Sequence, residues 1–248
     1  MAAKYSMKVY RYISFQRFCE LLFHQELALV HPSKWPDQYE TSVIRILKAP
    51  ENRKALEELF VRHGLSFEKH FDSFLETIQS VVDDMFCLCF SRSKDAEVMW
   101  NAYSFQNHAI MIRTSIDKLR ALNSESLTVF RVRYDLENSG LGTLLDNCTF
   151  EGNEVSVFND GDEIIRHKRK CFRYENEMRL VGSALYAPPD KVKDGILYLP
   201  IQNISDFIEG VMVHPLAEDR YVALIRKMCM HFGIKFWGRS KIYEFKGM

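Results

Sequence analysis

The apolar and polar residues of this chain follow two periods, one typical of strands and one typical of helices. Apolar-rich and alternating runs predict strands at 8–13, 27–31, 86–91, 109–113, 127–134, 172–181, 195–200 and 207–214, and in the closing IKFWG and KIYEF segments. Apolar residues three and four apart predict helices at 15–25, across 50–83, and at 94–105, 161–170 and 216–232. Ser14 stands where it can cap the first of these helices.

This order of elements predicts an α+β fold. The strands are too many for a helical bundle, and they do not alternate regularly with helices, which argues against a doubly wound parallel sheet. No repeat and no linker rich in Pro, Gly or Ser divides the chain. We therefore expect residues 1–248 to form a single α+β domain with a central mixed or antiparallel sheet and a helical insertion at about 48–84.

The stretch CFRYENEMRL, residues 171–180, carries the most informative charge pattern. If it is a strand, its side chains alternate between two faces. One face is then apolar, and the other holds a row of charges, Arg173, Glu175, Glu177 and Arg179. The two carboxylates lie about 6.6 Å apart along such a strand, at about 3.3 Å per residue. The row is either a solvated face whose charges satisfy one another or a functional site.

Residues near the ends of other predicted strands favour a site. Arg11 lies between two tyrosines on the first strand, where it is either a surface side chain or an anchor for an anion. Trp35 lies in a loop bounded by prolines, either as its hydrophobic anchor or in a functional role. Trp100 and Tyr103 share one side of the helix predicted at 94–105, a pattern more typical of a core than of a wall for a stacked base.

Composition limits the partners that we expect. Lys and Arg together number 33, as do Asp and Glu, so bulk charge gives no reason to expect nucleic-acid binding. No stretch approaches the roughly 18 apolar residues of a membrane span. The six cysteines form no C-x-x-C pair, and the N-terminal residues hold no apolar secretory region. We therefore expect a cytoplasmic protein, away from membranes, with reduced thiols.

Four stretches occur in an order that matches a known family. They are VYRYISF, LALVHPSKWPDQYE, CFS with MWNAY and HAIMI, and a lysine followed by YENEMRL. In this order they resemble the bacterial domain of unknown function 2971 family, from about Val9 to the final SKIYEF. Pro36-Asp37-Gln38 departs from the family's Asn-Asp-Pro loop, and Ala109 replaces its glycine. The resemblance to this family implies a fold but does not indicate an activity.

The same order resembles, more distantly, the ADP-ribosyltransferase folds. Those folds begin with a strand that bears Arg or His, and they place a catalytic glutamate, often in a Glu-x-Glu pair, on a late strand of a split sheet. The resemblance implies that Arg11 anchors the pyrophosphate of NAD, that Glu177 is the catalytic glutamate, and that Glu175 faces the acceptor.

The resemblance also implies aromatic and basic neighbours for NAD. The candidates for the NAD site are Tyr12, Trp35, Trp100, Tyr103, Arg179 and Lys170, of which the last two also hold the carboxylates ionised. Cleavage of the nicotinamide–ribose bond forms an oxocarbenium-like centre, as glycoside cleavage does. One carboxylate can stabilise that positive charge, and a second can orient or deprotonate the acceptor.

The sequence leaves three functions open. The first is an NAD-using, metal-free transferase in bacterial defence or a toxin, acting on an unknown acceptor, with proteins and nucleic acids among the candidates, or cleaving NAD. The second is a non-catalytic module that binds a nucleotide-like ligand or a protein. The third is a metal-dependent hydrolase or nuclease that uses Asp37, Glu40, Glu175 and Glu177. The oligomeric state is not indicated.

Overall fold

The computed structural model describes residues 6–37, 43–104, 106–122, 127–135, 148–151, 154–157, 165–187 and 189–244. A ten-stranded sheet organises these residues. Its strands are β1 (Lys8–Ile13), β2 (Glu26–Val30), β3 (Met85–Ser91), β4 (Ile110–Ser115), β5 (Leu127–Arg131), β8 (Glu177–Ser183), β9 (Val192–Lys193), β10 (Ile196–Pro200), β11 (Gly210–Val213) and β12 (Phe236–Arg239).

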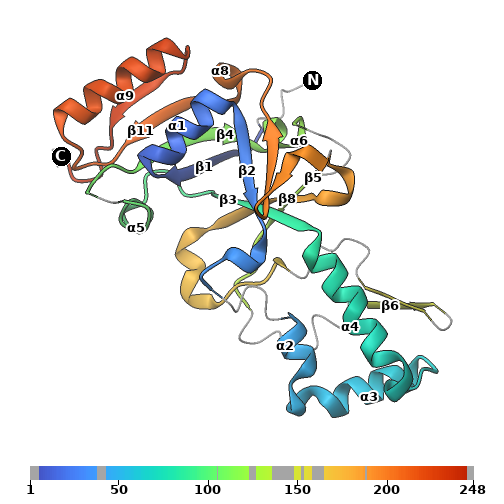
Figure 1. Ribbon diagram of the computed structural model, residues 1–248. Coiled ribbons are helices and arrows are strands. Elements are labelled where there is room, and N and C mark those ends of the chain that lie inside the picture. Colours follow the sequence, from blue (N-terminus) through green and yellow to red (C-terminus); the bar gives the residue numbers. More distant parts are fainter. Residues whose placement is uncertain are drawn as a thin grey trace, which may run out of the picture.

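The strands run in the order β12-β11-β4-β1-β3-β2-β10-β9, and β8 and β5 branch off at β3 (Figure 1). β11 and β12 are parallel, and the other strand pairs described in this sheet are antiparallel. The predicted mixed sheet is thereby confirmed. Among the described residues, no helix is long and apolar enough to cross a membrane.

The branch at β3 positions the candidate site. β3 pairs with β8 along its whole length, but with β1 only through Tyr10 and Ser91. Ser91 also pairs with Glu177 at the start of β8. β1 and β8 therefore approach each other at this end of β3 and are otherwise held by different neighbours. The side chains near this junction come from three strands.

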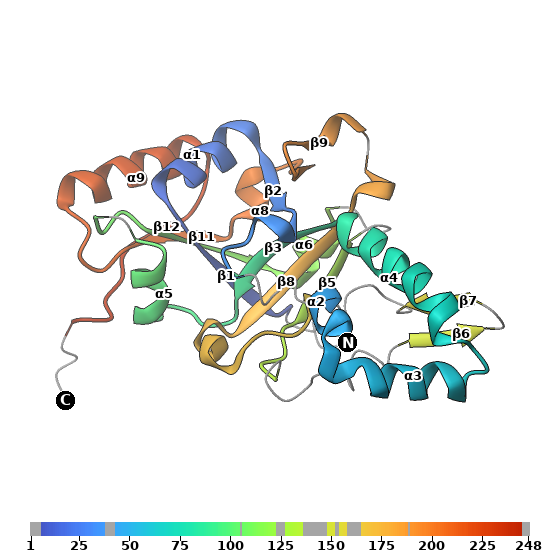
Figure 2. The same ribbon diagram turned by 60° about the horizontal axis from the view of Figure 1, so that its bottom comes forward.

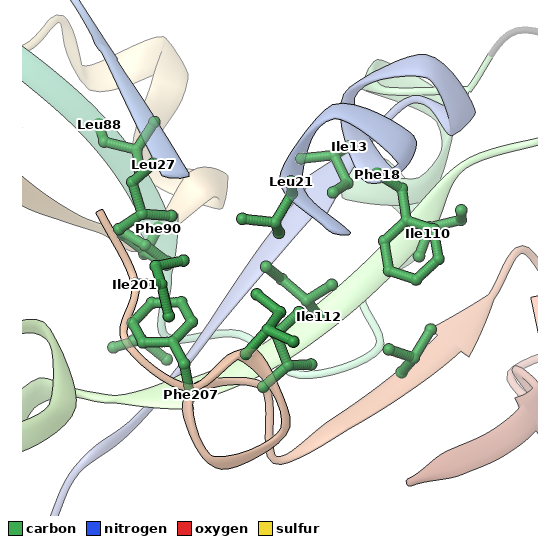
Figure 3. Packing of buried hydrophobic residues seen from close by; sticks show 14 of the residues in the cluster. Ile13, Phe18, Leu21, Leu27, Leu88, Phe90, Ile110, Ile112, Ile201 and Phe207 are labelled. Carbon is green, nitrogen blue, oxygen red and sulfur yellow. The ribbon is translucent and has the colours of Figure 1, made fainter. Parts of the chain in front are cut away.

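Two helices cover one face of the sheet and bury its main core. α1 (Phe15–His24) and α9 (Asp219–His231) lie side by side in both ribbon views (Figures 1 and 2). The Ser14 hydroxyl caps α1 by accepting from the Arg17 amide at 3.3 Å, as the sequence predicts. Phe18 and Leu21 of α1 point toward Ile110 and Ile112 of β4 (Figure 3). Burial of this apolar face fixes α1, and with it the β1 strand that precedes it.

Helices occupy the segment for which the sequence predicts a helical insertion. It consists of α2 (Val43–Lys48), the 3-10 turn η3 (Pro50–Asn52), α3 (Arg53–Arg62) and α4 (Phe67–Asp83). These helices extend away from the sheet beside the hairpin of β6 (Cys148–Glu151) and β7 (Glu154–Val157) (Figure 2). A second apolar cluster, which includes Phe60, Phe74 and Ile78, holds the insertion together.

Shorter elements connect the sheet. They are the helices α5 (Glu97–Ala102), α6 (Ile116–Arg120) and α8 (Ile204–Phe207), and the 3-10 turns η1 (Pro32–Lys34), η5 (Lys170–Glu175), η6 (Ala184–Tyr186) and η7 (Pro189–Lys191). α5 is shorter than the helix predicted at 94–105, and the predicted KIYEF strand is a turn as far as the structure describes it. The helix predicted at 161–170 is absent from its described part, 165–170, and its first residues lie outside the described ranges.

Candidate functional site

The segment before β8 is a turn of 3-10 helix rather than part of a strand. Lys170–Glu175 form η5, and β8 begins at Glu177. Asn176 lies between them with a φ of 45°, a left-handed conformation that asparagine tolerates better than most residues. Its side-chain amide donates to Ser93 Oγ at 3.2 Å, which holds the turn. The strand predicted at 172–181 is therefore wrong before Glu177, and strand alternation applies only from there on.

Glu177 is buried, with 2% of its surface exposed. Its Oε1 accepts from Arg179 Nε at 2.7 Å, and its Oε2 accepts from Lys168 Nζ at 3.2 Å. Its backbone N–H donates to Tyr134 Oη at 2.7 Å. The thiol of Cys89 also bonds to its carboxylate. This carboxylate does not belong to a solvated strand face, because it is enclosed and paired with two cations.

Arg179 has no exposed surface. It also donates to the backbone carbonyl of Ile165, and its guanidinium carbon lies 4.6 Å from the ring centre of Trp35. Every direction around the guanidinium is thus occupied by protein. Arg179 therefore cannot contact NAD directly. The prediction that it binds the cofactor is corrected: Arg179 positions Glu177.

Lys168 joins the two glutamates. Its Nζ donates to Glu175 Oε2 at 2.6 Å as well as to Glu177, and it lies 4.8 Å from the ring centre of Phe172. Lys168 is 7% exposed and precedes η5, whose turn brings Glu175 back over it. Lys170, the residue named from the sequence for this role, is exposed. The cation beside the carboxylates is Lys168 rather than Lys170.

The pKa values of the two glutamates are shifted in opposite directions. Burial favours a raised pKa for Glu177, but the charges of Arg179 and Lys168 outweigh it and lower the pKa to about 2. Burial, opposed by Lys168 and reinforced by the charge of Glu177, raises the pKa of Glu175 to about 7. At neutral pH the site therefore holds one fixed negative charge beside one carboxyl that exchanges protons. Such a division of two carboxyls is a way to assign an electrostatic and an acid–base role.

A small pocket of about 50 Å³ opens over these carboxylates. It lies at the junction of β1, β3 and β8. Its described lining is Tyr10, Arg11, Tyr12, Cys89, Phe90, Ser91, Met99, Tyr103, Lys168, Glu175 and Glu177. The Arg11 Nη1 donates to the Cys89 carbonyl at 2.7 Å, which turns the guanidinium from β1 toward β3. The structure thus brings Arg11, Glu175, Glu177, Tyr12 and Tyr103 around one cavity.

Two of the aromatic candidates lie elsewhere. Trp100 is fully buried and donates from Nε1 to Asp95 Oδ1 at 2.8 Å, with Tyr12 packed edge-on at 4.9 Å. It cannot stack on a ligand, so its place in the NAD site is corrected to the core. Trp35 packs against Arg179 and does not belong to the pocket's described lining. Tyr103 is 43% exposed and supplies the aromatic face at the rim.

Sequence reasoning missed Lys168, Ser91 and Cys89 as neighbours of the carboxylates. Lys168 rather than Lys170 points toward the carboxylates, because the 3-10 turn at 170–175 brings Glu175 back over Lys168. Cys89 and Ser91 occupy alternating positions of β3 that share the face with Glu177. This pairing of β3 with β8 is long-range and leaves no local sequence signal.

A metal centre does not follow from this geometry. The described residues contain no group of three or more His, Cys, Asp or Glu side chains that could hold a metal ion. Asp37, named for that role, accepts from Arg169 Nη2 at 3.1 Å. Glu40 lies outside the described residues. The five cysteines with described side chains are free thiols, and the side chain of Cys148 is not among them.

Comparisons with known proteins give little further identification. No family model matches the chain, so the resemblance to the domain of unknown function 2971 family stays a prediction, and no curated protein matches. Solved structures of DarT from Thermus sp. 2.9 are similar at 12–13% identity. The complex with NAD⁺ has a TM-score of 0.43 over 98% of this chain and 100% of that one. The complex with ADP-ribosylated single-stranded DNA has 0.40 over 93% of each chain.

A third DarT structure, in complex with carba-NAD⁺, has a TM-score of 0.38, with 96% of this chain and 95% of that chain covered. Similarity at this level does not decide the fold or the activity of the present chain. Any assignment of function rests on the side chains around the pocket.

Proposed function

We propose that this protein cleaves the bond between nicotinamide and ribose in NAD and transfers ADP-ribose to an acceptor or to water. The observation that carries the proposal is the pair of carboxyls in the β1–β3–β8 pocket. Glu177 is fixed as an anion by two cations, and Glu175, on the same lysine, has a pKa of about 7. This division fits a reaction that develops positive charge on a sugar while a proton leaves the acceptor.

The proposed step uses each carboxyl in one way. The bond between C1′ of the ribose and the nicotinamide nitrogen breaks, and its electron pair leaves with neutral nicotinamide. Glu177 stabilises the positive charge that develops on the ribose. An oxygen or nitrogen of the acceptor supplies the pair for the new bond to C1′, and its proton passes to Glu175. Arg179 and Lys168 keep Glu177 ionised throughout.

Two residues at the mouth of the pocket are assigned to binding. Arg11 uses one of its five N–H donors on the Cys89 carbonyl, so further donors can meet an anion. It also lines a second cavity of about 90 Å³, beside Arg17 and Leu27. Arg11 thus lines both cavities, and we assign its free donors on the side of the carboxylate pocket to the pyrophosphate, because Glu20 and Glu26 also line the other cavity. Tyr103 is assigned to the nicotinamide ring, because it is the exposed aromatic side chain in the described lining.

The size of the pocket adds a condition to the proposal. Cavities that enclose a drug-sized ligand measure about 300–1,000 Å³. A pocket of about 50 Å³ accommodates the reacting part of a ribose and not a whole dinucleotide. Most of NAD therefore lies outside this pocket, and entry moves side chains at its rim. Tyr103, which lies at the end of α5, is the residue that we expect to move.

The test is release of free nicotinamide from NAD by the purified protein, measured by chromatography with EDTA and with added Mg²⁺. We expect release in both conditions, and we expect it to be lost in Glu177→Gln. Glu76→Gln is the matched control, because Glu76 is an exposed glutamate on α4 without a described partner. NAD binding without any release by the wild type contradicts the enzyme and favours a binding module. Release that requires Mg²⁺ contradicts the metal-free mechanism.

A further inference from the structure

A third and larger cavity lies next to the pocket that holds Glu175 and Glu177, because two of its lining residues, Val132 and Tyr134, are bonded to the backbone of Glu177. It measures about 550 Å³, and its described lining is Arg131, Val132, Arg133, Tyr134, Asp135, Arg166 and Arg173. We call it the arginine groove. Four of these seven side chains are guanidinium groups, in a protein whose formal net charge is zero. Asp135, the one carboxylate among these described lining residues, is bonded to His167 Nδ1 at 2.6 Å. The groove is therefore a local concentration of positive charge.

The backbone beneath the arginine groove is held in place. The amide of Val132 donates to the Glu177 carbonyl at 3.1 Å, and the amide of Arg133 donates to the Arg166 carbonyl at 2.8 Å. Lys168 in turn donates from its amide to the Arg133 carbonyl at 2.8 Å. The first bond continues the pairing of β5 with β8 beyond the end of β5, and the other two form an isolated parallel bridge between Arg133 and His167. The arginines are thus presented by a fixed frame rather than by a free loop.

Tyr134 connects the groove with the carboxylate pocket. Its side chain lines the groove, and its hydroxyl accepts from the Glu177 amide at 2.7 Å. Lys168, which holds both glutamates, follows Arg166 by two residues. A ligand in the groove therefore lies next to the backbone that carries the proposed catalytic carboxylate. In the ribbon, β5 and β8 run beside each other at this point (Figure 2).

Arg131 and Arg173 are the side chains that lack partners. Both are exposed, and within the described residues neither guanidinium has a hydrogen bond or an ion pair. Some arginines elsewhere in the described residues are paired with carboxylates, for example Arg113 with Glu209 and Arg239 with Asp219. Two unpaired guanidinium groups in the lining of one groove suit a phosphate oxyanion, because the guanidinium fork matches the geometry of phosphate.

From these observations we infer that the arginine groove binds a phosphate group of the acceptor that receives ADP-ribose at Glu177, and that the acceptor is a nucleotide or a nucleotide strand. The catalytic part of this inference rests on the proposed function, whereas phosphate binding by the groove does not. Tyr174 adds an aromatic face near Arg173, since it is 41% exposed. Cationic grooves with exposed aromatic side chains are typical of single-stranded nucleic-acid sites.

The experiment measures binding directly, before any turnover. Fluorescently labelled single-stranded oligonucleotides of about 12 nucleotides, DNA and RNA, are titrated with the full chain at several salt concentrations. AMP and inorganic phosphate serve as competitors. The test variant is Arg131→Gln/Arg173→Gln. The matched control is Arg220→Gln/Lys227→Gln, which removes the same charge from exposed positions of α9, away from β5 in both ribbon views (Figures 1 and 2).

We expect the groove variant to weaken oligonucleotide binding by about tenfold or more, because each contact with a charged group is worth about 1.5–3 kcal/mol. The slope of log K against log salt should become shallower by about 1.4, since a single-strand phosphate contact contributes about 0.7. The control variant should change neither quantity. Competition by AMP as strong as by the strand assigns the groove to a free nucleotide, and weak competition assigns it to a strand.

No binding of any phosphate probe by the wild type overturns the inference, as does equal weakening in both double variants. The two proposals fail separately. Nicotinamide release without phosphate binding supports the proposed function and contradicts the inference about the arginine groove. Phosphate binding without nicotinamide release leaves the groove and removes the proposed function. Circular dichroism of both variants confirms that the comparison is between folded proteins.

Discussion

The pocket that holds Glu175 and Glu177, the carboxylate pocket, and the arginine groove meet at the start of β8. The charged side chains of the pocket are paired within the protein, whereas two of those in the groove are not. In the pocket, Glu177 is buried and its charge is met by Lys168 and Arg179. In the groove, Arg131 and Arg173 are exposed without a described protein partner. The pocket measures about 50 Å³ and the groove about 550 Å³. A buried charge that is paired within the protein, such as that of Glu177, shifts the pKa of a neighbouring group. Exposed charges without a protein partner, such as those of Arg131 and Arg173, are available to bind an anionic ligand.

This difference predicts that substitutions in the two regions affect different measurements. A change in the pocket should alter nicotinamide release and, because the charges are buried, also the free energy of unfolding. A change in the groove should alter phosphate binding and leave stability nearly level, since exposed substitutions usually shift it by less than about 0.5 kcal/mol. The substitutions below test this separation from the pocket side.

Glu177→Gln should have the largest effect. It removes the charge that stabilises the reacting sugar, so we expect nicotinamide release to fall by roughly a hundredfold or more. It also leaves Arg179 buried without its anion, and we expect a loss of about 3 kcal/mol in the free energy of unfolding at pH 7. Urea unfolding and chromatography of nicotinamide measure the two effects. Oligonucleotide affinity should stay level, and a loss there would break the separation between pocket and groove.

The dependence of the free energy of unfolding on pH below neutrality tests the same residue, Glu177. The folded pKa of Glu177, about 2, lies below the value of about 4.3 for an unfolded chain. Its ion pairs therefore stabilise the fold fully above about pH 4.3, and this stabilisation is lost as the pH falls toward 2. The stability gap between wild type and Glu177→Gln should narrow over that interval. A gap that is independent of pH would show that the pairing with Arg179 contributes no free energy.

The proton-exchanging role of Glu175 should appear in the pH profile. Its pKa of about 7 means that it is mostly protonated at pH 6 and mostly ionised at pH 8. If it accepts the acceptor's proton, transfer should rise by about tenfold between those values. Glu175→Gln should be slower and should lose this inflection, while binding in the arginine groove stays level. A wild-type profile that is flat from pH 6 to 8 would remove Glu175 as the base.

Sequence reasoning could find the carboxylates but not their surroundings. The sequence could indicate the Glu-x-Glu pair, and also Arg11 with the first strand that carries it. Both depend on patterns that are readable along the chain, namely strand alternation and the order of the motifs. The choice of Lys168 over Lys170 depends on the turn at Asn176, which one residue with positive φ creates. The burial of Arg179 depends on pairing of β8 with both β3 and β5, which lie far away in the sequence.

The arginine groove shows a second limit. Arg131, Arg166 and Arg173 are spread over more than forty residues, so no run of charge marks them, and the net charge of zero argued against such a surface. Trp100 shows the reverse error. Its spacing was compatible with both core and ligand wall, and its full burial against Tyr12 decides for the core. Helical spacing says which residues share a side, and only packing says what covers that side.

Arg11→Lys should have a smaller effect than either glutamate substitution. Lysine keeps the positive charge but loses the planar fork that meets a pyrophosphate with two bonds. We expect the KM for NAD to rise by about tenfold, with a smaller change in kcat, since one charge-assisted bond is worth about 1.5 kcal/mol. Steady-state kinetics at saturating acceptor measures both constants. A fall in kcat with an unchanged KM would place Arg11 in the chemical step rather than in binding.

Tyr103→Leu should have the smallest effect and is the sharpest test of the pocket's rim. The substitution removes an aromatic face worth about 0.5–1.5 kcal/mol when it stacks, so we expect the KM for NAD to rise by roughly threefold to tenfold. Stability should change little, because Tyr103 is 43% exposed. Trp100→Leu is the contrasting variant, since it empties a fully buried site and breaks the bond to Asp95. It should cost about 3 kcal/mol or more in unfolding free energy, with its effect on NAD following from the loss of folded protein. If Tyr103→Leu leaves the KM unchanged while Trp100→Leu raises it in fully folded protein, the nicotinamide lies on the inner side of α5, and the assignment of Tyr103 is wrong.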